Sequence, residues 1–87
     1  MHIHEAQHGI NVVVETANSV VIGRFDQTNG FQAVLHDCAV HTLLDGEDAE
    51  EFVRTSARYG FAVDKRDLMI EVGDIENVRV LGDIPKE

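Results

Sequence analysis

Two stretches of the chain decide its fold: residues 24–40, RFDQTNGFQAVLHDCAV, and residues 68–81, LMIEVGDIENVRVL. In the first stretch, the turn formers of residues 26–30 separate a strand end from a long apolar run. The second stretch predicts a short strand, a tight turn at Gly73-Asp74 and a final strand. Together the two stretches indicate a mainly β domain.

Further strands are predicted before and within these stretches. Residues 11–17 (NVVVETA) and 20–25 (VVIGRF) are rich in β-branched residues, and Asn18-Ser19 between them indicates a hairpin turn. Residues 31–44 carry apolar side chains on both alternating faces. That pattern is typical of a long bent strand that changes its buried side partway along a small barrel.

One helix is predicted after the long strand. Acidic residues crowd its start from Asp45 onward, and Arg54 and Arg58 lie late, which suits the helix dipole at both ends. One apolar stripe faces the rest of the domain, formed by Ala49, Phe52, Val53 and Ala57. Gly60 is predicted to end the helix.

We expect a single domain over residues 1–87, because no repeat or linker divides the chain. Residues 1–9 show no clear period and predict a polar arm or a short edge strand. Residues 64–67 predict a charged turn, and residues 82–87, which include the only proline, predict a flexible tail.

Composition indicates a cytoplasmic protein. The single cysteine, Cys38, excludes an internal disulfide framework and fits a reducing compartment. No apolar run approaches the roughly 20 residues of a membrane span. The first ten residues, MHIHEAQHGI, lack the basic region and apolar core of a secretory signal. We therefore expect no membrane association.

The net charge disfavours polyanionic partners. Sixteen acidic residues against seven basic ones give a net charge of −9. Nucleic-acid affinity rests largely on Lys and Arg facing phosphates, and here only Lys65-Arg66 form a cluster, between two aspartates. A local positive groove stays possible, because net charge does not say where charges lie.

Two motifs carry a resemblance to a known family. Residues 31–38 (FQAVLHDC) follow the register M-N-L-V-L-D-D-A, in which Leu35 and Asp37 match. Residues 70–78 (IEVGDIENV) follow the register I-R-G-D-N-V-V-L-I with the apolar positions aligned. At this spacing the chain resembles the Sm-like family of Sm, LSm and bacterial host factor proteins. It departs from the family at Gln32, where the motif has Asn, and at Glu71, where it has Arg.

The resemblance implies a small, strongly bent five-stranded Sm-like (SH3-like) barrel, here with a helix inserted between the third and fourth strands. In such proteins the fourth strand of one subunit pairs with the fifth of the next, which closes a homo-oligomeric ring of about five to seven subunits. The interface strands here would carry Leu68, Ile70, Val78 and Val80.

The resemblance also implies a nucleic-acid site. Phe31 would stack on a base and Gln32 would bond to it, with Asn29 and Gly73 shaping the loops. The implied function is binding of single-stranded nucleic acid, RNA rather than DNA, in an accessory role in its processing. One alternative interpretation makes Phe31 a core or strand-end residue. An alternative function is an acidic ring-forming protein-interaction module that does not bind nucleic acid, which Glu71 favours.

No metal, cofactor or enzymatic activity is predicted. The five histidines give only pairs of neighbouring ligands, such as His36 with Cys38, whereas zinc sites need about three or four converging ligands. Cys38 has no accompanying oxyanion-hole element and is expected to be a core thiol. Protonation of the histidines at about pH 6 would reduce the negative charge, which leaves a pH-dependent assembly open.

Overall fold

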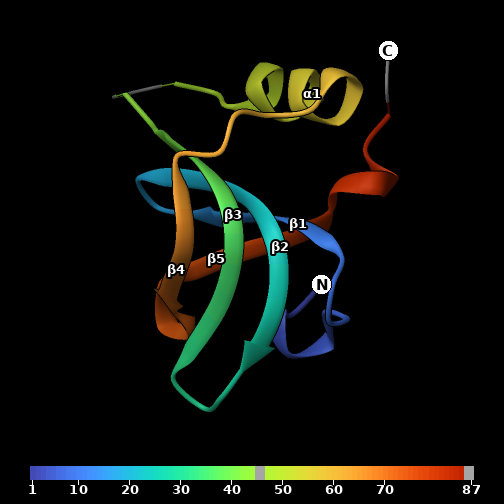
Figure 1. Cartoon of the computed structure of the whole chain (residues 1–87). Coiled ribbons are helices and arrows are strands. Elements are labelled where there is room, and N and C mark those ends of the chain that lie inside the picture. Colours follow the sequence, from blue (N-terminus) through green and yellow to red (C-terminus); the bar gives the residue numbers. More distant parts are fainter. Residues whose placement is uncertain (45–46, 86–87) are drawn as a thin grey trace.

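The structure, a computed structural model, describes residues 1–44 and 47–85. One antiparallel five-stranded sheet has the strand order β4-β3-β2-β1-β5. Its strands are β1 (Asn11–Thr16), β2 (Ser19–Thr28), β3 (Gln32–Thr42), β4 (Lys65–Glu71) and β5 (Ile75–Val80). Helix α1 (Glu50–Tyr59) lies between β3 and β4 in the chain (Figure 1). The predicted mainly β domain, with its helix between the third and fourth strands, is confirmed.

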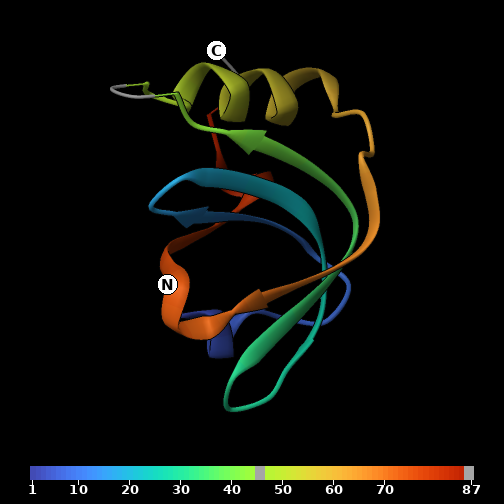
Figure 2. The ribbon, with the colours of Figure 1, turned by 90° about the vertical axis from the view of Figure 1, so that its left-hand side faces the viewer.

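The two long strands, β2 and β3, bend together (Figure 2). Their pairing register shifts twice, between Ile22 and Arg24 and between Phe25 and Gln27. At the first shift, a Cβ on Gly23 would lie 2.5 Å from the Sγ of Cys38, so the strands approach too closely for a side chain. On the facing strand, Asp37 has a φ of 51°, a left-handed conformation that is uncommon outside glycine.

The alternation of buried residues along β3 is interrupted at Asp37. Before that residue, Ala33 and Leu35 are buried in one hydrophobic cluster, and after it Cys38 belongs to the same cluster. Before Asp37 the residues that face the inner cluster have odd numbers, and after it they have even numbers. A β-bulge produces this change, because its extra residue disturbs the alternation of side chains. The predicted swap of the buried side is therefore not what happens: the buried residues change from odd to even positions, and the strand keeps one side on the inner cluster.

The central strands β1 and β2 are buried on both faces of the sheet. An inner cluster contains Ile3, Val12, Val14, Val21, Phe25, Ala33, Leu35, Cys38, Ile70 and Val78. A helix-side cluster contains Val13, Val20, Ile22, Ala49, Val53, Leu81 and Ile84. The alternate valines of β1 thus point to opposite faces, and all three are fully buried, which explains the apolar run NVVV.

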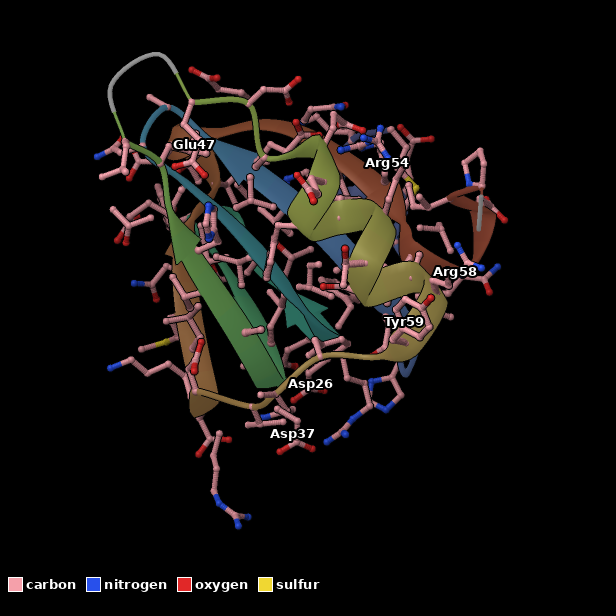
Figure 3. The ribbon with its side chains drawn as sticks, turned by 90° about the horizontal axis from the view of Figure 1, so that it is seen from above. Asp26, Asp37, Glu47, Arg54, Arg58 and Tyr59 are labelled. Carbon is pink, nitrogen blue, oxygen red and sulfur yellow. The ribbon has the colours of Figure 1, made fainter. Side chains whose placement is uncertain are left out.

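Helix α1 covers the helix-side cluster (Figure 3). Ala49 and Val53 of the predicted stripe are buried, while Phe52 and Ala57 are partly buried against the same cluster. Gly60, with a φ of 87°, follows the last helical residue, and its N–H bonds back to the carbonyl of Ser56. The predicted stripe and C-terminal glycine are confirmed; Asp45 of the predicted acidic start lies outside the described residues.

Both ends of the chain are packed more closely than the sequence suggests. In place of the expected polar arm or edge strand, Ile3–Glu5 forms a 3-10 turn closed by reciprocal capping between His2 and Glu5. Its Ile3 is only 1% exposed and belongs to the inner cluster. Of the expected tail, Ile84 is buried against the helix side, and residues 86–87 lie outside the described part of the chain.

The expected charged turn over residues 64–67 is mostly strand. β4 begins at Lys65, and its register places Lys65 opposite Cys38 and Asp67 opposite His36. Backbone pairing with the long β3 carries the strand through residues whose side chains are all exposed. Within residues 1–44 and 47–85, no helix is long and apolar enough to cross a membrane.

Candidate functional site

The predicted site lies where two loops meet. The β2–β3 turn and the connection from β4 to β5 adjoin at the lower end of the molecule in Figure 1. The N–H of Val72 donates to the carbonyl of Phe31 at 2.8 Å. The side-chain amide of Gln32 donates to Oε1 of Glu71 at 3.1 Å. The structure therefore brings Phe31 and Gln32 next to the turn that contains Gly73.

Asn29 orders the tip of the β2–β3 turn. Its Oδ1 accepts the N–H groups of both Phe31 and Gln32 at 2.8 Å, and its own N–H donates to the carbonyl of Gln32. Phe31 is 79% exposed, so it is held in solvent by a fixed turn and is not a core residue. A Cβ added at Gly73 would meet no atom within 4 Å, so packing there does not require glycine.

The charge at this site is negative. Glu71 occupies the position where the Sm-like motif has Arg, and a carboxylate can only accept hydrogen bonds. Lys65 and Arg66 begin the same strand at its opposite end. Phosphate groups at the loops would thus meet Glu71 without a neighbouring cation on β4.

Two of the sheet's arginines, Arg24 and Arg79, are paired with carboxylates. Arg24 donates to Asp37 at 2.8 Å. Arg79 donates to Glu15 at 3.1 Å and to Glu50 at 2.7 Å, and hydrogen bonding to Glu50 is the main cause that raises its pKa.

The arginines of the helix lie elsewhere. Arg54 and Arg58 extend from α1 on the opposite side of the view from Glu47 in Figure 3. Arg58 lies over the exposed ring of Tyr59, 5.2 Å from its centroid. These cations are therefore not part of the loop site.

A groove of about 610 Å³ runs beside the edge strand β4. Its apolar lining includes Val21, Val40, Leu68 and Ile70. Its acidic lining comes from Glu71, Asp74 and Glu76, around the connection from β4 to β5. The groove joins the free edge of the sheet to the loop site.

The strands predicted to form the subunit interface are the two outermost strands. Ile70 and Val78 are buried within the inner cluster of their own chain, while Leu68 and Val80 are partly buried. A second chain could therefore bind the outer strands mainly through their backbone hydrogen-bonding groups. Met69, 63% exposed on β4, was missed at the sequence level, although its position between Leu68 and Ile70 places it on the opposite face.

A second polar cluster, which local sequence spacing does not suggest, spans three strands. The ring of His36 on β3 contacts Asp26 of β2 at 2.8 Å and Asp67 of β4 at 2.7 Å. We call these residues the Asp-His-Asp cluster. Hydrogen bonding to Asp26 and then Asp67 raises the pKa of His36, and hydrogen bonding to His36 lowers the pKa of Asp26.

Two other residues that could take part in a reaction, Cys38 and His41, are engaged in packing and local bonding. Cys38 is fully buried, and burial raises the pKa of its thiol to about 11, so at neutral pH it is a protonated core thiol. His41 bonds to Glu47 at 2.6 Å and stacks on Phe52. Over the described ranges, no group of three or more His, Cys, Asp or Glu is arranged to hold a metal ion.

Residues 31–38 occupy the first part of β3 and the residue before it. Residues 70–78 occupy the last two residues of β4, the 3-10 turn Val72–Asp74 and the first four residues of β5. The chain matches no protein-family model, no curated protein and no solved structure.

Proposed function

We propose that the protein is a self-assembling Sm-like module whose copies join edge to edge, β4 of one copy with β5 of the next. The strand order carries this proposal, because it leaves β4 and β5 as the two outer strands. An outer strand presents unpaired backbone N–H and C=O groups along one side, which a second chain can satisfy. These are the same two strands that the Sm-like resemblance pairs between subunits.

This contact joins two different surfaces, so it repeats from copy to copy. Such an interface closes into a ring when the rotation between neighbours divides a full turn, and the resemblance favours about five to seven copies. The exposed Met69 lies on β4, as do Leu68 and Ile70 of the groove's apolar lining. A paired strand would cover this apolar surface, which adds burial to the backbone hydrogen bonds.

We infer that the loop surface of the assembly binds a protein segment that is both basic and apolar. Phe31 offers an exposed aromatic ring, and Glu71 bonds to the adjacent Gln32. The neighbouring groove adds the carboxylates of Asp74 and Glu76, with Lys65 as its cation. Each copy repeats this surface. A cationic partner is therefore attracted to it, whereas a polyanion is repelled.

Single-stranded nucleic acid is the second candidate ligand, RNA rather than DNA by the resemblance. One observation favours it: the ordered turn holds the ring of Phe31 in solvent, as a stacking platform requires. Glu71 could also accept a hydrogen bond from the amino group of a base. The negative charge opposes this candidate, so we place it second.

Fluorescence anisotropy with two labelled probes distinguishes the ligands. One probe is a short peptide of alternating Lys and Leu, and the other is single-stranded oligouridine. We expect the peptide to bind and oligouridine not to bind at about 50 mM salt, where phosphate contacts are strongest. Oligouridine binding that is lost at about 200 mM salt would favour the second candidate.

The substitution Glu71→Gln sharpens this test. It removes one negative charge at the loop site, so it should weaken peptide binding by about two- to fivefold and not create oligouridine binding. The matched control is Glu51→Gln, which makes the same charge change at an exposed position on α1. Equal effects of both substitutions would show that net charge, and not the loop site, determines peptide binding.

A further inference from the structure

The contacts of His36 fit the protonated form of its ring. Nε2 lies 2.8 Å from Oδ2 of Asp26, and Nδ1 lies 2.7 Å from Oδ1 of Asp67. A neutral imidazole has one N–H donor and one lone pair, so it can donate to only one of these carboxylates. Both contacts are hydrogen bonds only in the imidazolium form. The geometry is therefore that of a protonated histidine bridging β2, β3 and β4.

When His36 loses its proton, the contact with Asp67 is the weaker of the two. The Asp67 side chain is 80% exposed, whereas the Asp26 side chain is 29% exposed. Asp26 is also close to a second imidazole, because Nδ1 of His8 lies 3.2 Å from its Oδ1. Asp26 is thus held from two sides, and Asp67 is free to turn into water.

The other charged groups near His36 are already engaged with each other. Arg24 of β2 lies opposite His36 in the strand register, but its guanidinium bonds to Asp37 at 2.8 Å. Asp37 is the neighbour of His36 on β3. Asp26 and Asp67 are therefore the charged groups that contact His36 directly. His8 affects His36 only through its own contact with Asp26.

The first half of β4 pairs with β3 through its backbone but has few side-chain contacts besides this cluster. Lys65, Arg66 and Asp67 are all exposed, and the strand reaches the inner cluster only at Leu68 and Ile70. Asp64, just before the strand, bonds to the backbone of β3 through its N–H and its carboxylate. Between these two anchors, the contact from Asp67 to His36 is the side-chain tie across β3 and β4.

We propose that His36 is a pH-dependent tether that holds the first half of β4 on β3 and so controls whether the β4 edge can pair with another copy. Protonated His36 fixes the edge strand in the geometry that pairing needs. Neutral His36 releases Asp67, and the first half of the strand separates from β3 more often. The link to assembly rests on the proposed function, whereas the tether itself does not.

The direction of the pH effect follows from the same contacts. The pKa of folded His36 is raised above its ordinary value of 6.5. The stabilisation is therefore complete below that value and is lost as the pH rises through the higher pKa of the folded protein. Assembly should weaken over the same interval, where each copy also becomes more negative.

An NMR titration with hydrogen exchange of the β4 amides tests the tether. We expect His36 to titrate above its ordinary pKa, and the protection of residues 65–68, corrected for intrinsic exchange, to fall about two- to fivefold through that titration. Asp67→Asn should lower the pKa of His36 and abolish the step. His41→Gln is the matched control, since His41 bonds to Glu47 away from β4, and should leave the step unchanged.

Three outcomes would overturn the tether or its control of assembly, and a fourth separates the tether from the proposed function. A pH-independent protection of β4, or a step that survives in Asp67→Asn, would exclude the tether. A step in protection together with an oligomeric state that does not change with pH would exclude its control of assembly. A chain that is monomeric at every pH but keeps the step would refute the proposed assembly and support the tether.

Discussion

At Gly23 the lack of a side chain lets β2 and β3 approach at their bend. An added Cβ would lie 2.5 Å from Sγ of Cys38 and 3.2 Å from its Cα. The Sγ atom belongs to a fully buried side chain, and the Cα atom belongs to the backbone, which cannot rotate out of the way. The bend therefore depends on glycine at this position.

We predict that Gly23→Ala destabilises the protein by about 1–3 kcal/mol, the usual cost of an overpacked core. Urea denaturation of wild type and variant measures the change. Gly73→Ala is the control, because nothing lies within 4 Å of a Cβ there. In a Cys38→Ala background the cost of Gly23→Ala should fall, because the nearest clashing atom is gone. An equal cost in both backgrounds would contradict the packing argument.

At the loop site, the sequence predicts individual residues better than their partners. The turn formers before Phe31 correctly predict that a strand begins beside it. The binding role that the motif implies for Gln32 stays a prediction. The bond between Gln32 and Glu71 joins residues 39 positions apart and exists because of the β3–β4 register. The Asp-His-Asp cluster likewise depends on two strand registers, which no local spacing reveals.

Among the elements, Arg79 connects β5 to two neighbours. It donates to Glu15 on β1 and to Glu50 at the start of α1. Its side chain is 29% exposed, so these bonds are partly shielded from water. One residue of an outer strand thus fixes the helix over the sheet.

We predict that Arg79→Gln lowers the free energy of unfolding by about 1 kcal/mol, the upper range for partly exposed ion pairs. Thermal or urea unfolding measures the loss. Arg54→Gln is the matched control on α1, since Arg54 is exposed and has no carboxylate within 4 Å among the described residues. Equal costs of the two substitutions would contradict this role of Arg79.

The elements themselves are largely predictable, and their ends are not. Hydrophobic periodicity and residue composition predict each strand and the buried stripe of α1. β4 begins earlier than expected because its backbone pairs with β3 despite a charged sequence. The 3-10 turn at Ile3–Glu5 could not be predicted from the sequence. Ile3 is its only buried residue, and one apolar residue gives no hydrophobic periodicity from which an element can be predicted.

For the whole molecule, assembly must overcome charge repulsion. Each copy carries a net charge of −9, which a ring multiplies. Salt screens this repulsion, with a Debye length of about 10 Å at 0.1 M. Backbone pairing between β4 and β5 is short-range and is less affected by salt. Moderate salt should therefore favour the assembled form and not dissociate it.

Native mass spectrometry of the untagged protein, purified without nuclease, tests the edge-to-edge assembly most directly. We predict one closed ring of about five to seven subunits without mass that ribonuclease removes. Ribonuclease-sensitive mass on the same ring would keep the assembly and change the ligand to RNA. A monomer at every concentration, or a symmetric dimer that does not grow, would contradict pairing of β4 with β5 from copy to copy.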